Sequence, residues 1–425
     1  MPDPRSWTAG AGCWLLRTVR LTLASSFAMC AWGQDATTFH RTTNTDNWDD
    51  GGERSRYVYL HASEFFPTAV VERSGPVSEL LYEEDARVGA YEFTSESGER
   101  TSLEEYVSAS GIDGFIALHR GRIVYEAYPR MRPQEKHLLF SVTKAMIGTA
   151  VGLLEDRGEI DLDQSIDRYI RELTGTAWAG ISVRDIMEMA SGIEGAETDG
   201  SGALEDPRHK HYQLEASLGW LPIVPGLPGP VSEGDTYAFL ATLTRADEPG
   251  TQWKYTSINT AVLGWLLESV TDKPLARVLS EELWWRIGAE SDALLVVNEL
   301  GIPVAHGGMA TTLRDLARFG LLFTRSWSAV TSNQVVSPRF VERIQHDGRP
   351  ELITDRLDEI HHAAYQWDGV TDRGAFFKGG FAGQFLMVFP AEDVVFAYFG
   401  TNDTLHSEPE GLPLRRMVDD LFGEP

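Results

Sequence analysis

The sequence predicts an α/β (α+β) fold, with an antiparallel sheet built from both ends of the chain and flanked by helices. Apolar and aromatic runs at residues 115–119 and 123–128 are separated by His-Arg-Gly-Arg, a turn that joins two strands in a hairpin. A mostly helical region, about residues 160–310, follows. Strands at both ends with helices between them favour one shared sheet with a helical insertion. The strand-like runs near the C-terminus lie at residues 375–377, 384–389 and 394–399.

The best-defined predicted helix follows this hairpin. Apolar residues that recur at helical spacing predict that it begins near Ser141 and ends at Gly158. Other helices are predicted from N-terminal capping pairs or from apolar periodicity. They lie at residues 182–191, 258–270, 312–322 and 414–422.

The N-terminal segment predicts export. Residues 1–33 combine arginines, a short apolar stretch at 21–31 and small residues before a cleavage point ahead of Gln34, which is typical of a secretory signal peptide. The alternative is an unstructured tail, because two arginines interrupt the apolar region. We expect residues 34–84 to form a flexible lead-in and N-terminal extension, and residues 85–425 to form the main domain of a periplasmic or secreted protein.

The composition argues against several classes of function. The formal net charge of −26 repels phosphate backbones and anionic lipids, so neither nucleic acid nor an anionic membrane surface is an expected partner. No apolar run reaches the roughly 18 residues of a transmembrane helix, so no integral membrane segment is expected. Both cysteines, Cys13 and Cys30, precede the main domain, which excludes a cysteine nucleophile, a disulfide and a cysteine zinc site there.

A serine and a lysine three residues apart carry the first chemical signal. The chain has only six lysines, and Ser141-x-x-Lys144 is its one Ser-x-x-Lys motif. At the start of a helix the two side chains share a face, so the Lys144 amine can accept the Ser141 proton if burial lowers its pKa. The helix N-terminus adds free N–H groups where an oxyanion would form. The alternative is a capping serine beside a solvent-facing lysine.

Two further segments carry polar residues that suit the same chemistry. Tyr-Thr-Ser at residues 255–257 precedes a predicted helix, and Lys-Gly-Gly-Phe at residues 378–381 opens a predicted strand. Taken alone, Tyr255 would be a core aromatic with a satisfied hydroxyl, and Lys378 an edge-strand charge that discourages aggregation. Both become candidates for function through the family resemblance that the three motifs carry together.

The three motifs together resemble the penicillin-recognising serine enzymes, which include beta-lactamases, DD-peptidases and related esterases and amidases. The resemblance covers about residues 85–425 and is closest to the class C-like branch, especially the 6-aminohexanoate-dimer hydrolase group. It implies a beta-lactamase/transpeptidase-like fold and a serine hydrolase that cleaves a small-molecule ester, amide or lactam through an acyl-enzyme. The further segments that carry the resemblance are residues 262–265, 307–320, 365–367 and 383–384.

The resemblance also implies roles for the matching residues. Ser141 would attack the carbonyl, while Lys144 and Tyr255 would share the general-base and general-acid work. Backbone N–H groups of Ser141 and Phe381 would form the oxyanion hole. Neither a metal nor an organic cofactor is implied. The residues expected around the substrate and the oxyanion are Ser257, Lys378, Gly380 and Phe381.

Two positions depart from the pattern of the beta-lactamases. Ser257, which would orient the substrate or relay a proton, stands where an asparagine is typical, and Gly379 replaces a threonine and its hydroxyl. Lys378 still offers a positive charge for an acidic group of the substrate. Both departures weaken the case for efficient beta-lactam hydrolysis. We therefore expect an esterase or amidase, with a true beta-lactamase or DD-peptidase, or an acylated or ligand-occupied sensor without turnover, as the alternatives.

Three other segments are interpreted as loops. The histidines of residues 209–211 and 361–362 lack the spacing and the carboxylate partners of known metal sites, so we expect solvated loops. The proline-rich stretch at residues 221–230 cannot be regular helix or central strand. It is either an outer surface loop or part of the wall of a substrate pocket, and long loops of both kinds occur.

Overall fold

The computed structural model describes residues 36–95, 97–198, 202–224, 235–353, 360–404 and 411–423. The expected signal segment and residues 225–230 of the proline-rich stretch lie outside these ranges. The chain divides into two units, Met1–Trp48 and Asp49–Pro425. In the first unit, residues 36–42 are helical. All of the strands described below belong to the second unit.

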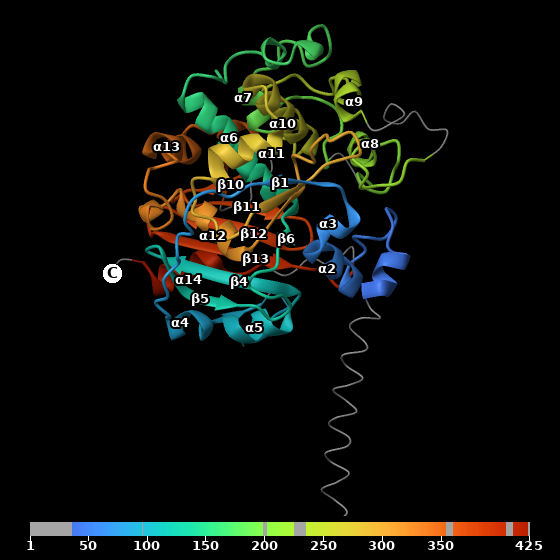
Figure 1. The fold of residues 1–425 in the computed structure, drawn as a ribbon. Coiled ribbons are helices and arrows are strands. Elements are labelled where there is room, and N and C mark those ends of the chain that lie inside the picture. The colour runs from blue at the N-terminus through green and yellow to red at the C-terminus, as the bar shows by residue number, and fades with distance from the viewer. Residues whose placement is uncertain are drawn as a thin grey trace, which may run out of the picture. The chain divides into compact units, whose positions relative to one another are not determined.

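A seven-stranded antiparallel sheet organises the second unit (Figure 1). Its strands are β4 (Ile112–His119), β5 (Arg122–Ala127), β9 (Ile360–Ala364), β10 (Trp367–Thr371), β11 (Phe376–Gly380), β12 (Gln384–Phe389) and β13 (Val394–Gly400). Their order is β5-β4-β13-β12-β11-β10-β9. Strand β4 pairs with β13, which places Phe115 opposite Tyr398. This pairing confirms the prediction of a sheet built from both ends of the chain.

The predicted hairpin between the first two strands of this sheet is also confirmed. The turn from β4 to β5 lies at Arg120 and Gly121, whose φ angles are both positive, 51° and 73°. Positive φ at both central residues is the geometry that fits the right-handed twist of a two-residue hairpin. The glycine adopts it without steric cost.

The helices of the second unit lie on both faces of the sheet and above it (Figure 1). Helix α12 packs against β4, β12 and β13 on one face, while an apolar cluster on the other joins the sheet to α4, α5 and α14. This cluster includes Val88, Val107, Phe115 and Met417. The bounds of the helices are α2 (Gly52–Leu60), α3 (Ala62–Phe65), α4 (Ala86–Gly89), α5 (Leu103–Ala109), α6 (Thr143–Asp156), α7 (Val183–Met187), α8 (Lys210–Ser217), α9 (Thr236–Thr242), α10 (Ser257–Thr271), α11 (Leu275–Leu279), α12 (Leu313–Leu321), α13 (Pro338–His346) and α14 (Leu414–Leu421).

Two smaller sheets complete the unit. The larger contains β1 (Thr68–Val71), β6 (His137–Leu138), β7 (Ala293–Val296) and β8 (Met309–Thr311), in the order β1-β7-β8-β6. The smaller is the hairpin of β2 (Glu92–Thr94) and β3 (Arg100–Ser102). Strand β1 lies in the expected N-terminal extension but pairs with β7. This part of the extension is therefore built into the folded unit.

The predicted helices form close to their expected positions. The Ser-x-x-Lys segment begins as a short 3₁₀ turn, η1 (Phe140–Val142), and continues into α6, whose residues are buried on all sides from Thr143 to Leu154. Helix α10 matches the predicted 258–270 segment. Helix α7 ends at Met187, earlier than predicted, because Met189 already has a positive φ of 55°.

Two histidines expected in solvated loops are buried instead, and the prediction was wrong for both. His211 lies on α8 with 4% of its surface exposed, and His362 lies on β9 with 1% exposed. The nitrogen Nε2 of His362 lies 2.9 Å from Ile344 O. Local polarity suggested loops, but packing of α8 and β9 against their neighbours decides the burial of these rings.

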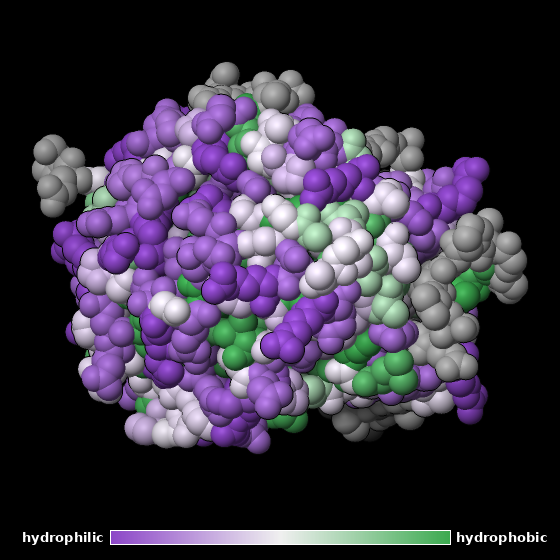
Figure 2. All heavy atoms as spheres, turned by 90° about the horizontal axis from the view of Figure 1, so that it is seen from above, coloured by the Kyte–Doolittle hydropathy of each residue, from purple (hydrophilic) through white to green (hydrophobic). Residues whose placement is uncertain are grey.

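One face of the molecule shows how polar and apolar residues are distributed over the surface. Viewed from above, the molecule is mostly hydrophilic, and apolar side chains form scattered patches (Figure 2). Within the described ranges, none of the helices combines the length and the apolarity that crossing a membrane requires.

Candidate active site

Ser141, the predicted nucleophile, lies in a tight turn that contacts strand β11. A Cβ atom added to Gly380 would lie 2.6 Å from Leu139 O and 3.3 Å from Ser141 N, so only glycine lets the strand approach this closely. The preceding residue, Phe140, has a φ of 45°, which is uncommon for an aromatic residue. Its buried ring packs 5.3 Å, between centroids, from the ring of Phe381. The strained turn is therefore fixed by packing, next to the two residues expected to line the oxyanion hole.

Lys144 lies directly beside the serine. Its Nζ donates hydrogen bonds to Ser141 Oγ at 2.8 Å and to His306 O at 2.9 Å, and its side chain is fully buried. Burial lowers the pKa of Lys144 to about 7, and the nearby charge of Glu197 opposes the fall. A lysine with this pKa is partly neutral at neutral pH, so it can accept the serine proton.

Tyr255 lies between the two lysines of the site. Lys144 Nζ is 5.1 Å from the centre of its ring, and Lys378 Nζ is 4.8 Å from the ring centre and donates to the hydroxyl at 3.1 Å. Burial raises the pKa of Tyr255 well above its usual value, and the charges of Asp368 and Glu197 raise it further. The phenol therefore stays protonated at neutral pH, which suits it to donate a proton rather than to act as the initial base.

Ser257 is held by a carboxylate that the motifs did not reveal. Its backbone N–H donates to Glu197 Oε1 at 2.8 Å, and Glu197 N donates in turn to Tyr255 O at 2.9 Å. Burial by itself would raise the pKa of Glu197, but the charges of His211 and Lys144 and the hydrogen bonds of Ser257 lower it to about 2. Glu197 is therefore a fixed negative charge beside Lys144.

Lys378 is not a free cation. Its side chain is fully buried, and its Nζ lies 2.5 Å from Asp368 Oδ1 on the neighbouring strand β10. The other carboxylate oxygen of Asp368 accepts a hydrogen bond from Gly379 N at 2.9 Å. Because this ion pair is internal, the charge of Lys378 is already balanced before any substrate enters.

A second layer of charged groups surrounds Lys144. His306 Nε2 lies 2.8 Å from Glu215 Oε1, and His211 lies 3.6 Å from both Glu215 and Glu197. Burial would raise the pKa of Glu215, but the charges of His306 and His211 and the hydrogen bond from His306 lower it. This layer connects back to Lys144 through the carbonyl of His306. Helix α8, within the loosely patterned stretch of the sequence, thus contributes two side chains to the surroundings of the site.

The structure brings the predicted site residues together and adds five that none of the three motifs contains. Ser141, Lys144, Tyr255 and Lys378 are joined by direct contacts, and Ser257 lies next to Tyr255. No spacing rule marked the three acids among them, because isolated acids are common in a chain with 63 Asp and Glu, and His211 was expected to lie in a solvated loop. The added residues are Glu197, His211, Glu215, His306 and Asp368.

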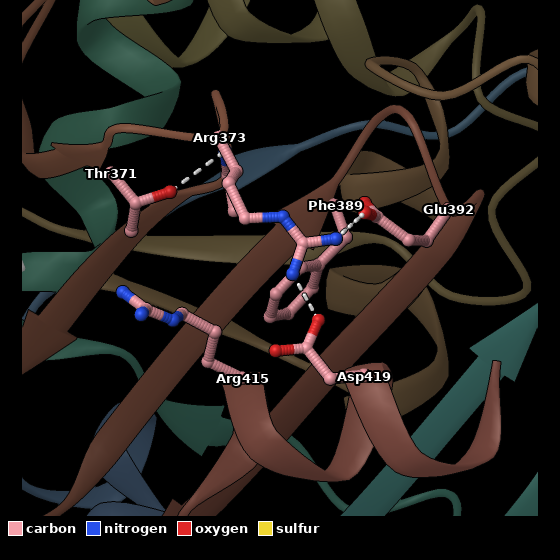
Figure 3. Close-up of a pocket in the computed structure, with 7 residues that line it drawn as sticks. Thr371, Arg373, Phe389, Glu392, Arg415 and Asp419 are labelled. Atoms are coloured by element: carbon pink, nitrogen blue, oxygen red, sulfur yellow. Dashed lines mark hydrogen bonds and ion pairs between the residues drawn. The ribbon is translucent and has the colours of Figure 1, made fainter. Parts of the chain in front are cut away.

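Neither a metal site nor the hollow shown in Figure 3 competes with this arrangement in the described part of the chain. Across the described part of the chain, no group of three or more His, Cys, Asp or Glu side chains is arranged to hold a metal ion. The hollow in Figure 3 is lined by Thr371, Arg373, Ala375, Phe389, Glu392, Arg415 and Asp419, and it shares no residue with the Ser141 site. Arg373 bridges Glu392 and Asp419 there, so its charge is already compensated.

Comparison with known proteins shows which family this sequence belongs to. The profile of the Beta-lactamase family matches residues 103–418. The chain belongs to the beta-lactamase family. It is 32% identical over 356 residues to the 6-aminohexanoate-dimer hydrolase of Paenarthrobacter ureafaciens, a match that covers 82% of this chain and 86% of that protein.

Solved structures of the family share the fold. A protein from Bacillus anthracis assigned as a 6-aminohexanoate-dimer hydrolase superimposes with a TM-score of 0.75 at 24% identity, over 89% of this chain and 95% of that one. EstCE1, described as a hydrolase with promiscuous acyltransferase activity, superimposes with a TM-score of 0.54 at 15% identity, over 70% of this chain and 91% of that one. The beta-lactamase/transpeptidase-like fold expected from the motifs is thereby confirmed.

Proposed function

We propose that this beta-lactamase-family hydrolase cleaves an ester or amide bond through a covalent acyl-serine intermediate. The observation that carries the proposal is the 2.8 Å hydrogen bond between Lys144 Nζ and Ser141 Oγ, in surroundings that lower the pKa of the lysine to about 7. A serine hydroxyl becomes a useful nucleophile only when a neighbouring base can take its proton.

In the proposed acylation, Ser141 Oγ attacks the carbonyl carbon and its proton passes to Lys144 Nζ. The backbone N–H groups of Ser141 and Phe381 stabilise the oxyanion, and the close approach of Gly380 to Ser141 N supports this placement. The bond to the leaving group then breaks, and Tyr255 supplies the proton that the leaving group needs. Lys144 returns its proton to Tyr255, which restores both residues.

In the proposed deacylation, a water molecule attacks the acyl-serine carbonyl and gives up its proton to Lys144. The bond between the acyl carbon and Ser141 Oγ breaks, and Lys144 returns the proton to the serine. The product is a carboxylic acid, and the enzyme regains its initial protonation state. Lys144 thus acts as base in each addition and as acid, directly or through Tyr255, in each elimination.

The name of the curated relative favours a linear amide or a related ester over a lactam. The Paenarthrobacter ureafaciens protein is called a 6-aminohexanoate-dimer hydrolase and matches most of this chain. The alternatives are a true beta-lactamase or DD-peptidase, and a sensor that is acylated without turnover. A sensor is disfavoured because the nucleophile, base and proton donor expected for turnover are all present and in contact.

The test is a parallel rate screen of short-chain nitrophenyl esters, linear amide oligomers and nitrocefin, with Ser141→Ala as the matched control. Multiple turnovers of an ester or an amide, lost in the control, are expected. Faster turnover of nitrocefin than of any ester or amide would favour the beta-lactamase alternative. A single burst of product with no further turnover would favour the sensor.

We also propose that the protein is exported and that the mature chain begins near Gln34. The support is the leader of basic, apolar and small residues in the sequence. The measurement is N-terminal peptide mapping of protein recovered from fractionated cells. Intact Met1 in a purely cytoplasmic fraction would contradict the proposal.

A further inference from the structure

We propose that Asp368 makes this active site select against acyl substrates that carry a carboxylate. The inference rests on the proposed acyl-serine hydrolase function. It assigns Asp368 as a residue that determines specificity, a role that no sequence motif indicated. It also reverses the expectation that Lys378 offers a positive charge to an acidic substrate group.

The positive charge of Lys378 is already neutralised by its ion pair with Asp368. Its Nζ lies 2.5 Å from Asp368 Oδ1 and 3.1 Å from the hydroxyl of Tyr255, and its side chain is completely buried. A carboxylate of the substrate would have to displace Asp368 in order to reach this ammonium. That exchange would leave the displaced Asp368 without its ion-pair partner, which is costly for a partly buried acid.

Within this ion pair, Asp368 and not Lys378 is exposed to solvent. The side chain of Lys378 is 0% exposed, while that of Asp368 is 25% exposed. The hydrogen bond from Gly379 N holds the second oxygen of Asp368 at the edge of β11. The accessible part of this ion pair is therefore a carboxylate edge and not an ammonium.

A second carboxylate, that of Glu197, adds to the negative charge of Asp368 near the site. Glu197 has the same sign and a side chain that is 25% exposed. Asp368 is linked through Lys378 Nζ to the hydroxyl of Tyr255, and Glu197 Oε1 accepts a hydrogen bond from Ser257 N at 2.8 Å, so both acids lie beside residues of the site. The charges of Asp368 and Lys378 offset each other within their ion pair, and Glu197 is a further carboxylate in the same region. A substrate carboxylate near these groups meets like charges at short range, where solvent screening is weak.

The experiment uses a matched pair of esters. 4-Nitrophenyl pentanoate is neutral, and in 4-nitrophenyl hydrogen glutarate a carboxylate replaces its terminal methyl group. The spontaneous hydrolysis rate is subtracted from each. Rates are measured at low salt and at about 1 M salt, where the Debye length is about 3 Å and the general repulsion by the acidic surface is removed. The wild-type enzyme should still favour the neutral ester in kcat/KM by about tenfold or more at high salt.

Asp368→Asn removes the carboxylate and keeps the side-chain size. It should raise the ratio of glutarate to pentanoate kcat/KM by about tenfold, whatever happens to the absolute rates. Glu99→Gln is the matched control, because it removes the same charge from an exposed turn between β2 and β3. This control should leave the ratio unchanged.

Equal kcat/KM values for the two esters at high salt, or a preference for the glutarate, would overturn the inference. An unchanged ratio in an active Asp368→Asn enzyme would also overturn it. If this variant fails to fold, the wild-type ratio at high salt decides the matter. Failure to turn over either ester would overturn the proposed function and this inference with it, whereas turnover without discrimination would overturn the inference alone.

Discussion

The ammonium of Lys378 donates a hydrogen bond of 3.1 Å to the hydroxyl of Tyr255. This contact joins strand β11 to the segment just before α10. It therefore brings the third motif, which contains Lys378, into contact with the second, which contains Tyr255. The first motif joins them through Lys144, whose Nζ lies 5.1 Å from the centre of the same tyrosine ring. Tyr255 therefore lies between both lysines, and its position depends on each of them.

Removal of the phenol tests the role of Tyr255. Tyr255→Phe should lower kcat on a nitrophenyl ester or an amide by about 10²- to 10⁴-fold, the usual contribution of a positioned acid or base. The loss should be larger for an amide, because its amine leaving group needs a proton. Steady-state kinetics with both substrates provide the check. A kcat within about threefold of wild type on the amide would remove Tyr255 from the proposed chemistry.

The pH dependence of the reaction should report Lys144. Because the lysine must be neutral to act as a base, kcat/KM should rise with pH through about 7, the pKa to which burial lowers Lys144. Glu197 carries a negative charge that stabilises the ammonium form and so opposes this fall. Glu197→Gln should therefore lower the pKa of Lys144 and move the acid limb of the profile to lower pH.

The profile is measured with one neutral ester for the wild type, Glu197→Gln and Glu99→Gln. The last of these changes the net charge equally at an exposed turn and should leave the limb in place. A limb that moves to higher pH in Glu197→Gln, or that does not move, would show that Glu197 does not act on the titrating group.

Stability should depend on a buried acid at the start of α12. Asp315 Oδ1 accepts hydrogen bonds from Glu290 N at 2.9 Å and from Arg318 Nη1 at 2.9 Å, and the acid and the arginine are both buried. Asp315→Asn removes one of the two carboxylates that balance Arg318, and breaking a buried pair costs about 3–5 kcal/mol. We expect the lower end of this range, because Arg318 keeps its ion pair with Glu290 at 3.3 Å and also donates to Ser78 O.

The urea midpoint at unchanged slope measures this loss. Glu172→Gln, at an exposed position, is the control and should stay within about 0.5 kcal/mol of wild type. An equal midpoint for Asp315→Asn and wild type would show that the buried pair contributes nothing to stability.

Substrate preference should follow the third motif. The wild-type enzyme should hydrolyse short-chain esters or linear amides with higher kcat/KM than nitrocefin, because Gly379 lacks the hydroxyl that the beta-lactamase motif implies at this position. A Cβ added to Gly379 would meet only Asp368 Oδ2, at 3.6 Å, so a side chain fits there. Gly379→Thr should shift the preference towards nitrocefin by about tenfold or more, since one well-placed donor contributes about 2.7–4 kcal/mol in a transition state. A wild-type preference for nitrocefin would contradict this expectation.

The sequence predicted those parts of the fold and the site that depend on local patterns. The hairpin at Arg120 and Gly121 follows from a turn of two residues that suits positive φ, and the N-terminus of α12 follows from Thr312, whose side chain accepts from Asp315 N at 3.2 Å. The Ser141–Lys144 contact is equally local, because Ser141 lies on the 3₁₀ turn η1 and Lys144 on the first turn of α6, which follows it directly.

The residues that the sequence did not predict are those brought in by long-range packing. Glu197 reaches Ser257 across 60 positions of the chain, and Glu215 reaches His306 across 91. Asp368 is nearer to Lys378 in sequence, but their pairing depends on the register of β10 with β11. Such partners are set by tertiary structure, and no short motif encodes them.

The central claim is that Ser141 is the nucleophile that becomes acylated. The most direct measurement is mass spectrometry of the protein after reaction with a fluorophosphonate or a slowly deacylating ester, followed by peptide mapping. We expect one added group, located on the peptide that contains Ser141, and no added mass in folded Ser141→Ala protein. A label on any other serine, or equal labelling of the Ser141→Ala variant, would contradict the account.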